Sequence, residues 1–195
     1  SGRLPGHITT GAARSLAAAT TAILVVLLTG SPALAGFQPQ QTFTVGSEPS
    51  AVASAEFNGD GKPDLAVVNR GAASFSVSVL LNTTAPGATT ATFSPQVAFS
   101  TGTTPVGVAT GDLNGDGKPD LAVGNLGSNS VSVLLNTTAP GATTPSFATQ
   151  VQFPTGVQSQ GVAVADLNDD GKPDLAVANP GSGNISVLLN QTATG

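Results

Sequence analysis

The sequence of 195 residues contains no Cys, Met, Trp or Tyr, and aromatic residues make up only 4% of it. Without Cys there are no disulfides, thiolate metal sites or cysteine nucleophiles. With Phe alone of the large aromatic residues, sugars and nucleic-acid bases have little to stack on. The core must be built from small aliphatic side chains in short strands, and the 24 Gly and 14 Pro suit the turns between them. This composition favours an all-β fold.

Charged residues are also scarce, at 9% of the sequence, and the formal net charge is -5. This balance argues against nucleic acid and anionic membrane surfaces as partners, because both need basic patches. The only His, His7, lies near the N-terminus, and Ser and Thr have no partner to activate them, so we expect no enzyme activity. All the acidic residues except Glu48 fall within three short windows. Solubility alone does not explain such clustering.

The N-terminal segment has the pattern of a secretory signal peptide. Arg3 and Arg14 precede an apolar run from Leu16 to Leu28, and small residues follow up to Ala35. We predict that residues 1–35 are removed by cleavage after Ala35; a retained anchor is the alternative. The apolar run is shorter than the ~20 residues of a membrane span. We therefore expect a secreted or cell-surface protein with no membrane span after cleavage.

The remaining residues, 36–195, contain three similar stretches. They are EFNGDGKPDLAVVN from Glu56, DLNGDGKPDLAVGN from Asp112 and DLNDDGKPDLAVAN from Asp166. They predict three repeats, at about 37–91, 92–145 and 146–195. Each repeat has four candidate strands: one with two Phe six residues apart, one before the acidic stretch, one reading Asp-Leu-Ala-Val, and one ending in Ser-Val-Leu-Leu-Asn. The Asp-Leu-Ala-Val strand is apolar on successive residues, which indicates burial on both faces.

Four antiparallel strands in a unit of about 40 to 60 residues are typical of a β-propeller blade. The main rival is a β-solenoid, whose coils are usually shorter and need no group of four strands. We predict an all-β protein with three blades of four antiparallel strands, forming an open arc, or partial propeller. The open edges imply either further blades outside this chain or association of copies. The first is favoured, because the last repeat stops shortly after its fourth strand.

The acidic stretches have the spacing of calcium loops. In the second, oxygen-bearing side chains stand at positions one, three, five and nine, namely Asp112, Asn114, Asp116 and Asp120. Lys118, at position seven, offers its carbonyl oxygen. Hard oxygen ligands in a crowded, flexible loop favour Ca²⁺ over Mg²⁺ and over softer metals. An EF-hand is excluded, because position twelve is a Val instead of a Glu and a Pro stands where the exiting helix would begin.

These loops and their flanking strands resemble the FG-GAP and VCBS repeats of integrin-alpha-like β-propellers, from Phe37 to the end. The resemblance implies calcium ligands at positions one, three, five, seven (by its carbonyl) and nine of each loop: Glu56, Asn58, Asp60, Lys62 and Asp64; Asp112, Asn114, Asp116, Lys118 and Asp120; Asp166, Asn168, Asp170, Lys172 and Asp174. Two residues depart from the family pattern. Glu56 replaces an Asp and adds a methylene, and Asp169 replaces a Gly and adds a charge. Family members close a ring of about seven blades.

Two functions remain open from the sequence. The first is a secreted calcium-binding module for extracellular binding or adhesion, with a protein or glycan ligand. The second is a noncatalytic repeat domain appended to a secreted hydrolase. In both, calcium stabilises the blade loops, and a structural role for the ion is favoured over direct recognition. The Asn-x-Thr sequences at Asn82, Asn136 and Asn190 recur at the same place in each repeat, which indicates turn chemistry at strand ends instead of glycosylation.

Overall fold

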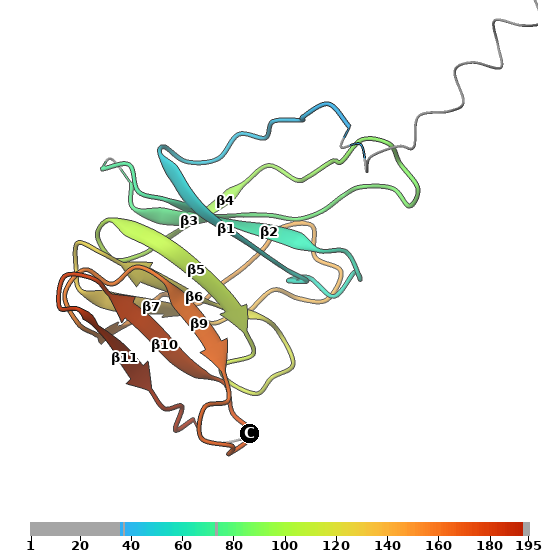
Figure 1. Cartoon of the computed structure of the whole chain (residues 1–195). Helices are drawn as coiled ribbons and strands as arrows, with labels where there is room; N and C mark the ends of the chain where they lie inside the picture. The colour runs from blue at the N-terminus through green and yellow to red at the C-terminus, as the bar shows by residue number, and fades with distance from the viewer. Residues whose placement is uncertain (1–35, 37, 73, 193–195) are drawn as a thin grey trace, which may run out of the picture. The chain divides into compact units, whose positions relative to one another are not determined.

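The computed structural model describes residues 36, 38–72 and 74–192 (Figure 1). The predicted signal peptide, residues 1–35, lies outside the described residues. The chain divides into two compact units, Ser1–Gln40 and Gln41–Gly195, and the fold below is that of the second unit. Within the described ranges, no helix is long and apolar enough to cross a membrane.

The described residues form strands in three antiparallel sheets, as the sequence predicted. The first sheet contains β1 (Pro49–Ala55), β2 (Asp64–Asn69), β3 (Ser76–Leu80) and β4 (Val97–Ser100). The second contains β5 (Pro105–Gly111), β6 (Asp120–Asn125), β7 (Ser130–Leu134) and β8 (Val151–Pro154). The third contains β9 (Val162–Ala165), β10 (Asp174–Asn179) and β11 (Asn184–Leu188). The first two sheets have the expected four strands, and three strands of the third are described.

The prediction that one repeat supplies all four strands of a sheet is wrong. The outer strand β4 pairs with β3, with Val77 opposite Phe99, although Phe99 belongs to the following sequence repeat. In the same way β8 pairs with β7, with Val131 opposite Phe153. Phe93 and Phe147, the first Phe of these two pairs, lie outside the strands, in isolated bridges to Asn82 and Asn136. A long connection returns the chain to the open edge of the sheet it has just built, because an unpaired β3 or β7 would leave a row of backbone groups unbonded.

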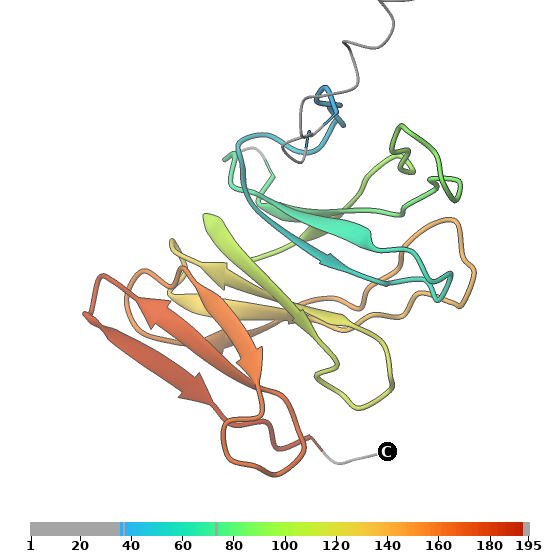
Figure 2. The same ribbon diagram turned by 45° about the vertical axis from the view of Figure 1, so that its right-hand side comes forward.

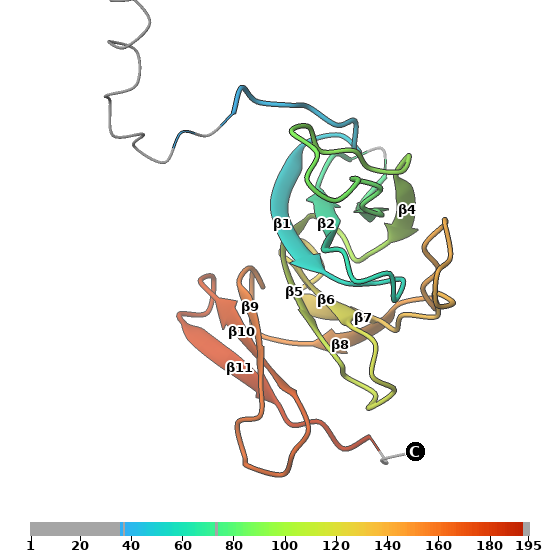
Figure 3. The same cartoon turned by 90° about the vertical axis from the view of Figure 1, so that its right-hand side faces the viewer.

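The three sheets pack one after another without closing a ring (Figures 2 and 3). One buried cluster joins the first sheet to the second and includes Phe57, Val68, Val79, Leu121 and Val123. Another joins the second sheet to the third, with Leu113 and Val131 packed against Leu175 and Val177. The second sheet lies between the other two, and every residue of its strand β6 is buried. This agrees with the predicted burial of Asp-Leu-Ala-Val on both faces and with an open arc of propeller blades.

A buried Asn ends each middle strand and ties it to the next. Asn69, Asn125 and Asn179 are fully buried, and each donates from Nδ2 to Ser hydroxyls of the neighbouring strand, at 2.8 Å for both Ser78 and Ser132. A Gly from the preceding loop lies against each Asn, and a Cβ at Gly102 would come within 2.6 Å of the Asn125 side chain. The hydrogen bonds between Asn and Ser side chains stabilise the end of each sheet that lies opposite the acidic loops.

Candidate metal-binding loops

The three acidic loops occupy equivalent places in the fold. They connect β1 to β2, β5 to β6 and β9 to β10, and all lie at the same end of their sheets (Figure 2). Each loop begins where a first strand ends and stops where a buried middle strand starts. The loop is therefore held at both ends by the sheet, and its first eight residues lie outside the strands and form a tight turn.

In the second loop, the carboxylate at position one is surrounded by backbone amides. Asp112 Oδ1 accepts from the N–H groups of Gly115 and Asp116, at 2.8 and 3.1 Å, and Oδ2 accepts from Gly117 N–H at 2.8 Å. The chain thus wraps around the carboxylate over positions four to six. This requires left-handed backbone at two of those positions, and Gly115 and Gly117 have φ values of 78° and 82°.

The third loop repeats this geometry. Asp166 accepts from Asp169 and Gly171 N–H groups, both at 2.7 Å, and the Gly171 hydrogen bond is the main cause that lowers the pKa of the Asp166 carboxyl. Asp169 takes the left-handed place of Gly115, with φ of 64°. The residue that departs from the family pattern at position four thus adopts a backbone conformation that costs a non-Gly residue energy.

The first loop is wrapped less tightly. Glu56 Oε1 accepts from the N–H groups of Asn58 and Asp60, both at 3.1 Å. The extra methylene moves its carboxylate away from the amides at positions four and six that Asp112 engages. The Lys62 ammonium lies 3.8 Å from an Asp60 carboxylate oxygen, a partly exposed ion pair that contributes little to stability.

Positions three and five form successive short turns. Asn114 Oδ1 accepts from Asp116 N–H at 3.1 Å, and Asp116 Oδ1 accepts from Lys118 N–H at 2.9 Å. In the third loop, Asn168 and Asp170 make the same contacts, at 3.2 and 2.9 Å. One carboxylate oxygen of Asp116 is therefore engaged within the loop, and the side chain lies at the exposed surface.

The Asp at position nine lies apart from this exposed group. Asp64, Asp120 and Asp174 are all fully buried at the start of a middle strand. Asp120 Oδ2 accepts from Leu113 N–H at 2.9 Å, and Oδ1 accepts from Asn136 N–H at 2.7 Å. Asp64 and Asp174 repeat both contacts. The ninth residue thus ties the loop to the end of the third strand, whatever else its carboxylate binds.

The pKa of the Asp120 carboxyl is raised to about 6, mainly by burial and in smaller part by the carboxylates of Asp116 and Asp112. Two backbone hydrogen bonds act in the opposite direction and lower it. Burial also raises the pKa of Asp64, with a smaller contribution from Asp60 and Glu56. The first and second loops therefore place an anion that is costly to bury near other anions, and a bound cation would offset that cost.

The donor set fits calcium in kind, since each loop combines carboxylate, amide and carbonyl oxygens. An orphaned atom in the first loop supports this fit: Asn58 Oδ1 is buried without a hydrogen-bond partner, while Asn58 Nδ2 donates to the Ala142 carbonyl. Among the described side chains, however, no group of three or more His, Asp and Glu is arranged to hold a metal ion by itself. A metal site would need the amide and main-chain oxygens of the loop and a closer approach of the ninth carboxylate. The predicted ligand sets remain predictions.

Sequence reasoning missed the role of the strand-end Asn residues in these loops. Asn136 Nδ2 donates to the Phe57 carbonyl at 3.0 Å, and Asn190 Nδ2 donates to the Leu113 carbonyl at 2.8 Å. Each Asn thus reaches back from one sheet to the acidic loop of the sheet before it. Its Oδ1 accepts from the backbone N–H of the residue two places later, a turn that favours Asn at the start of each Asn-x-Thr sequence. The recurrence of this motif was the signal, and the turn chemistry inferred from it is correct.

The family assignment follows from matches that include these loops. A family model described as FG-GAP-like repeat matches residues 56–123 and again 112–177, and one described as FG-GAP repeat matches residues 160–195. The chain belongs to the FG-GAP-like repeat family. Each FG-GAP-like match runs from one acidic loop through the next, so it includes the outer strand that crosses the repeat boundary. All three loops of this FG-GAP-like chain lie within matched residues. No relative among the curated proteins matches the chain.

Proposed function

We propose that this FG-GAP-like chain is a secreted, noncatalytic, calcium-binding β-propeller module. Calcium would bind the three acidic loops, stabilise the ends of the sheets and hold the surrounding loops in place for extracellular binding or adhesion. The observation that carries the proposal is the wrapped carboxylate of the second and third loops. Backbone amides orient Asp112 and Asp166, and the oxygens at positions three and five follow them in a tight turn.

The ion would act mainly on the packing between sheets. The first loop contacts the second sheet's connection, because Asn58 donates to Ala142 and Asn136 donates to Phe57. Ordering this loop would therefore favour the packed arrangement of neighbouring sheets over the separated one. Calcium binds only the folded loop, so its binding energy adds to the stability of the fold.

The expected affinity is that of extracellular calcium modules, roughly 10⁻⁴ to 10⁻³ M. A hundredfold excess of calcium over the dissociation constant stabilises the folded chain by about 2.7 kcal/mol per site. We expect a higher unfolding temperature in calcium than in chelator, and a smaller increase in magnesium. An unfolding temperature that is the same in calcium and in chelator contradicts the proposal.

The third loop offers a matched pair of variants that separates ligand loss from charge loss. Asp170→Asn removes a carboxylate at position five, and Asp169→Asn removes one at position four, which is outside the proposed ligand pattern. Each neutralises one charge, and Asn at 170 keeps an oxygen to accept from Lys172 N–H. We expect Asp170→Asn to lose one calcium site in a calorimetric titration and Asp169→Asn to keep all of them. If both variants lose calcium binding equally, the binding depends on the total negative charge of the loop and not on the proposed ligand positions.

A further inference from the structure

The connections from β3 to β4 and from β7 to β8 contain the same run of eight residues. Residues 83–90 and 137–144 both read TTAPGATT, and neither connection contains a charged residue. Each run holds one Thr pair before the Ala-Pro-Gly-Ala stretch and a second Thr pair after it. Segments rich in Thr and Pro are typical carriers of O-linked sugars in exported proteins. Composition alone does not distinguish the two Thr pairs, but the structure does.

The first Thr pair closes the base of each connection. In the second connection, Thr138 Oγ1 donates to the Ser146 carbonyl and accepts from Ser146 N–H, both at 3.0 Å. The Thr137 and Ser146 hydroxyls are hydrogen-bonded to each other at 2.8 Å. Thr138 is only 1% exposed. A sugar on either hydroxyl would displace these hydrogen bonds, so the first pair has a structural role.

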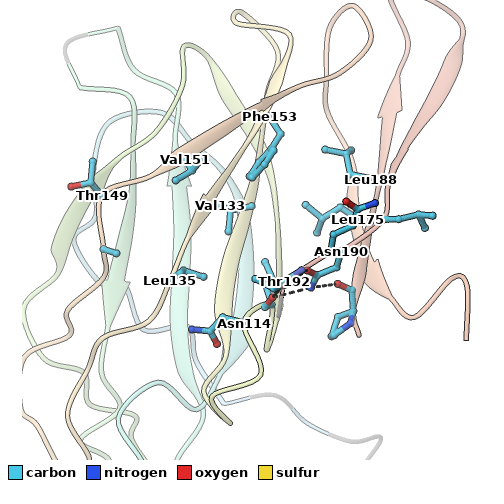
Figure 4. A pocket seen from close by; sticks show the side chains of 15 residues that line it. Asn114, Val133, Leu135, Thr149, Val151, Phe153, Leu175, Leu188, Asn190 and Thr192 are labelled. Carbon is cyan, nitrogen blue, oxygen red and sulfur yellow. Dashed lines mark hydrogen bonds between the residues drawn. The ribbon is translucent and has the colours of Figure 1, made fainter. Parts of the chain in front are cut away.

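The other two repeats use Thr in the same way. Thr83 and Thr84 bond to Thr92 across the first connection, and Thr84 Oγ1 accepts from Thr92 N–H at 2.9 Å. In the third repeat, the Thr192 hydroxyl donates to the Leu113 carbonyl at 3.2 Å, beside the groove between the second and third sheets (Figure 4). The Thr hydroxyls that follow the strand-end Asn are therefore engaged in all three repeats.

The second Thr pair lies at the surface, after a tight turn. Ala142 N–H donates to the Ala139 carbonyl at 3.0 Å, and Gly141 has a φ of 71°, as a type II turn with Pro and Gly at its centre requires. Thr143 and Thr144 follow in a bend, and both are exposed. Within the described ranges, no hydrogen bond reaches either hydroxyl. These two side chains therefore have no structural role that a modification would disturb.

The first connection has the same arrangement. Ala88 N–H donates to the Ala85 carbonyl at 3.1 Å, and Gly87 has a φ of 74°. Thr89 and Thr90 follow the turn and are exposed. The two connections are the green and the yellow-orange loops at the right of Figure 2. The chain thus presents the same exposed Thr pair twice.

Packing between sheets does not cover the second Thr pair. The second connection lies against the first acidic loop, where Asn58 Nδ2 donates to the Ala142 carbonyl at 2.9 Å. Thr143 directly follows Ala142 and is still exposed, as is Thr144. The pair is therefore accessible in a connection that otherwise belongs to the contact between two sheets.

We propose that Thr143 and Thr144, with Thr89 and Thr90, are acceptor sites for O-linked sugars. A glycosyltransferase would join the Thr oxygen to the anomeric carbon of a phosphate-activated sugar. The bond from that carbon to the phosphate oxygen breaks, the phosphate leaves with the bonding electrons, and the hydroxyl proton passes to a base of the transferase. An exposed, irregular bend enters an enzyme cleft without opening a strand. The proposal rests on the export of the chain, which is part of the proposed function.

The surroundings favour a sugar over a phosphate group at these hydroxyls. Phosphorylation adds a charge of about −1.5 to −2 at pH 7. In the second connection this charge would lie near the first acidic loop, which already contains Glu56, Asp60 and Asp64. Neither connection contains a Lys or Arg to pair with a phosphate. A neutral sugar adds no charge and needs no such partner.

The test is mass spectrometry of the full chain recovered from the culture medium of its source organism. We expect mass additions of whole sugar residues, which fragmentation places on Thr143 or Thr144 and on Thr89 or Thr90. An exported chain in which these four residues are unmodified, or carry phosphate, overturns the proposal and leaves the proposed calcium binding untouched. A chain that is not exported contradicts the secretion part of the proposed function, and the modification with it.

Matched variants test the choice between the two Thr pairs. Thr143→Val combined with Thr144→Val should abolish the sugar on the second connection and leave that on the first connection unchanged. Thr137→Val is the control, because Thr137 is also exposed but its hydroxyl is bonded to Ser146. We expect this control to keep its sugar in full. Equal losses in the two variants, or a sugar placed on Thr137 or Thr138, overturn the assignment.

Discussion

The Asp120 carboxylate has a structural role that does not depend on a bound ion. It is fully buried, and its two oxygens accept backbone hydrogen bonds from the start of its loop and from the end of the third strand. These contacts compensate only part of the cost of burying an anion, which is why its pKa is raised to about 6. The same residue type at the exposed position one, Asp166, has its pKa lowered. The two Asp side chains therefore differ in pKa because of their surroundings, Asp120 being buried and Asp166 exposed and hydrogen-bonded to backbone amides.

This difference predicts a pH dependence of the calcium-free chain. The pKa of Asp120 is higher in the folded chain than the ordinary 3.8, so its unfavourable burial is absent below about pH 4 and grows as the pH rises through about 6. Asp64 acts in the same direction. The lowered pKa of Asp166 adds stability that is lost only as the pH falls below the ordinary value, outside this range. In chelator, we expect the free energy of unfolding to be about 1 kcal/mol greater at pH 5 than at pH 7.

Urea denaturation at the two pH values checks this prediction, with Asp120→Asn as the control that should reduce the difference. A calcium-free chain that is equally stable at pH 5 and pH 7 would mean that Asp120 is charged as easily in the folded state as in the unfolded one. With saturating calcium, we expect the advantage of pH 5 to disappear, because protons and the metal compete for the same carboxylates.

At the scale of elements, neighbouring sheets are joined by polar contacts as well as by apolar packing. Asn136 lies at the end of β7 and reaches the carbonyl of Phe57 in the first acidic loop. It is 1% exposed, so the groups that it satisfies have no access to water. Asn82 stands at the same place after β3, but its Nδ2 donates to Pro63 within its own sheet. The two residues therefore separate the contribution of the contact between sheets from that of the local turn.

We expect Asn136→Ala to lower the free energy of unfolding by roughly 2–4 kcal/mol, since it leaves Phe57 C=O and Thr138 N–H buried without partners. Asn82→Ala should cost about 1 kcal/mol, because the groups that it leaves are nearer to solvent. Chemical denaturation of the two variants under the same conditions measures the difference. Equal losses would indicate that the turn, and not the contact between sheets, accounts for the role of Asn136.

The strands themselves were largely predictable from sequence, and the sheets were not. Alternation and continuous apolar runs locate β1, β2 and β3 and their counterparts, because side-chain burial follows directly from those patterns. The segments around Phe99 and Phe153 were also recognised as strands. Their partners were misassigned, because sequence order favours pairing with the next strand, whereas the open edge of the previous sheet was the unsatisfied one. Pairing between distant segments leaves no local pattern to detect.

In the candidate loops, too, the sequence predicted some features and not others. Spacing identified the residues at positions one, three and five, and the structure brings them into one turn. It did not show that the ninth residue is buried and bound to backbone amides, because burial depends on the neighbouring sheet. The left-handed φ of Asp169 had a signal in the sequence, since Asp replaces a Gly there and nothing else in the loop changes.

At the scale of the whole molecule, stability should decrease along the array of sheets. Every residue of β6 is buried, whereas most residues of β11 are exposed or partly exposed, as are those of β9. Repeat arrays open from the element with the fewest packed neighbours. The third sheet is therefore expected to open before the second.

Amide hydrogen exchange tests this expectation in dilute, calcium-free solution. We expect amides of β9 and β11 to exchange at least about tenfold faster than those of β6, which corresponds to a difference in opening free energy of about 1.4 kcal/mol. Strands β3 and β7, whose outer edges are paired in the structure, serve as the internal reference. Uniform protection across all three sheets would indicate a single cooperative unit instead.

The offset between sequence repeats and sheets has a consequence for how such a gene can grow. Each copied unit brings an outer strand for the sheet before it and an open edge for the unit after it. Duplicating or deleting a whole unit therefore leaves the pairing within the other sheets unchanged, because each outer strand still meets the edge that it completes. Changing the number of units changes the length of the array without requiring a new kind of contact between sheets.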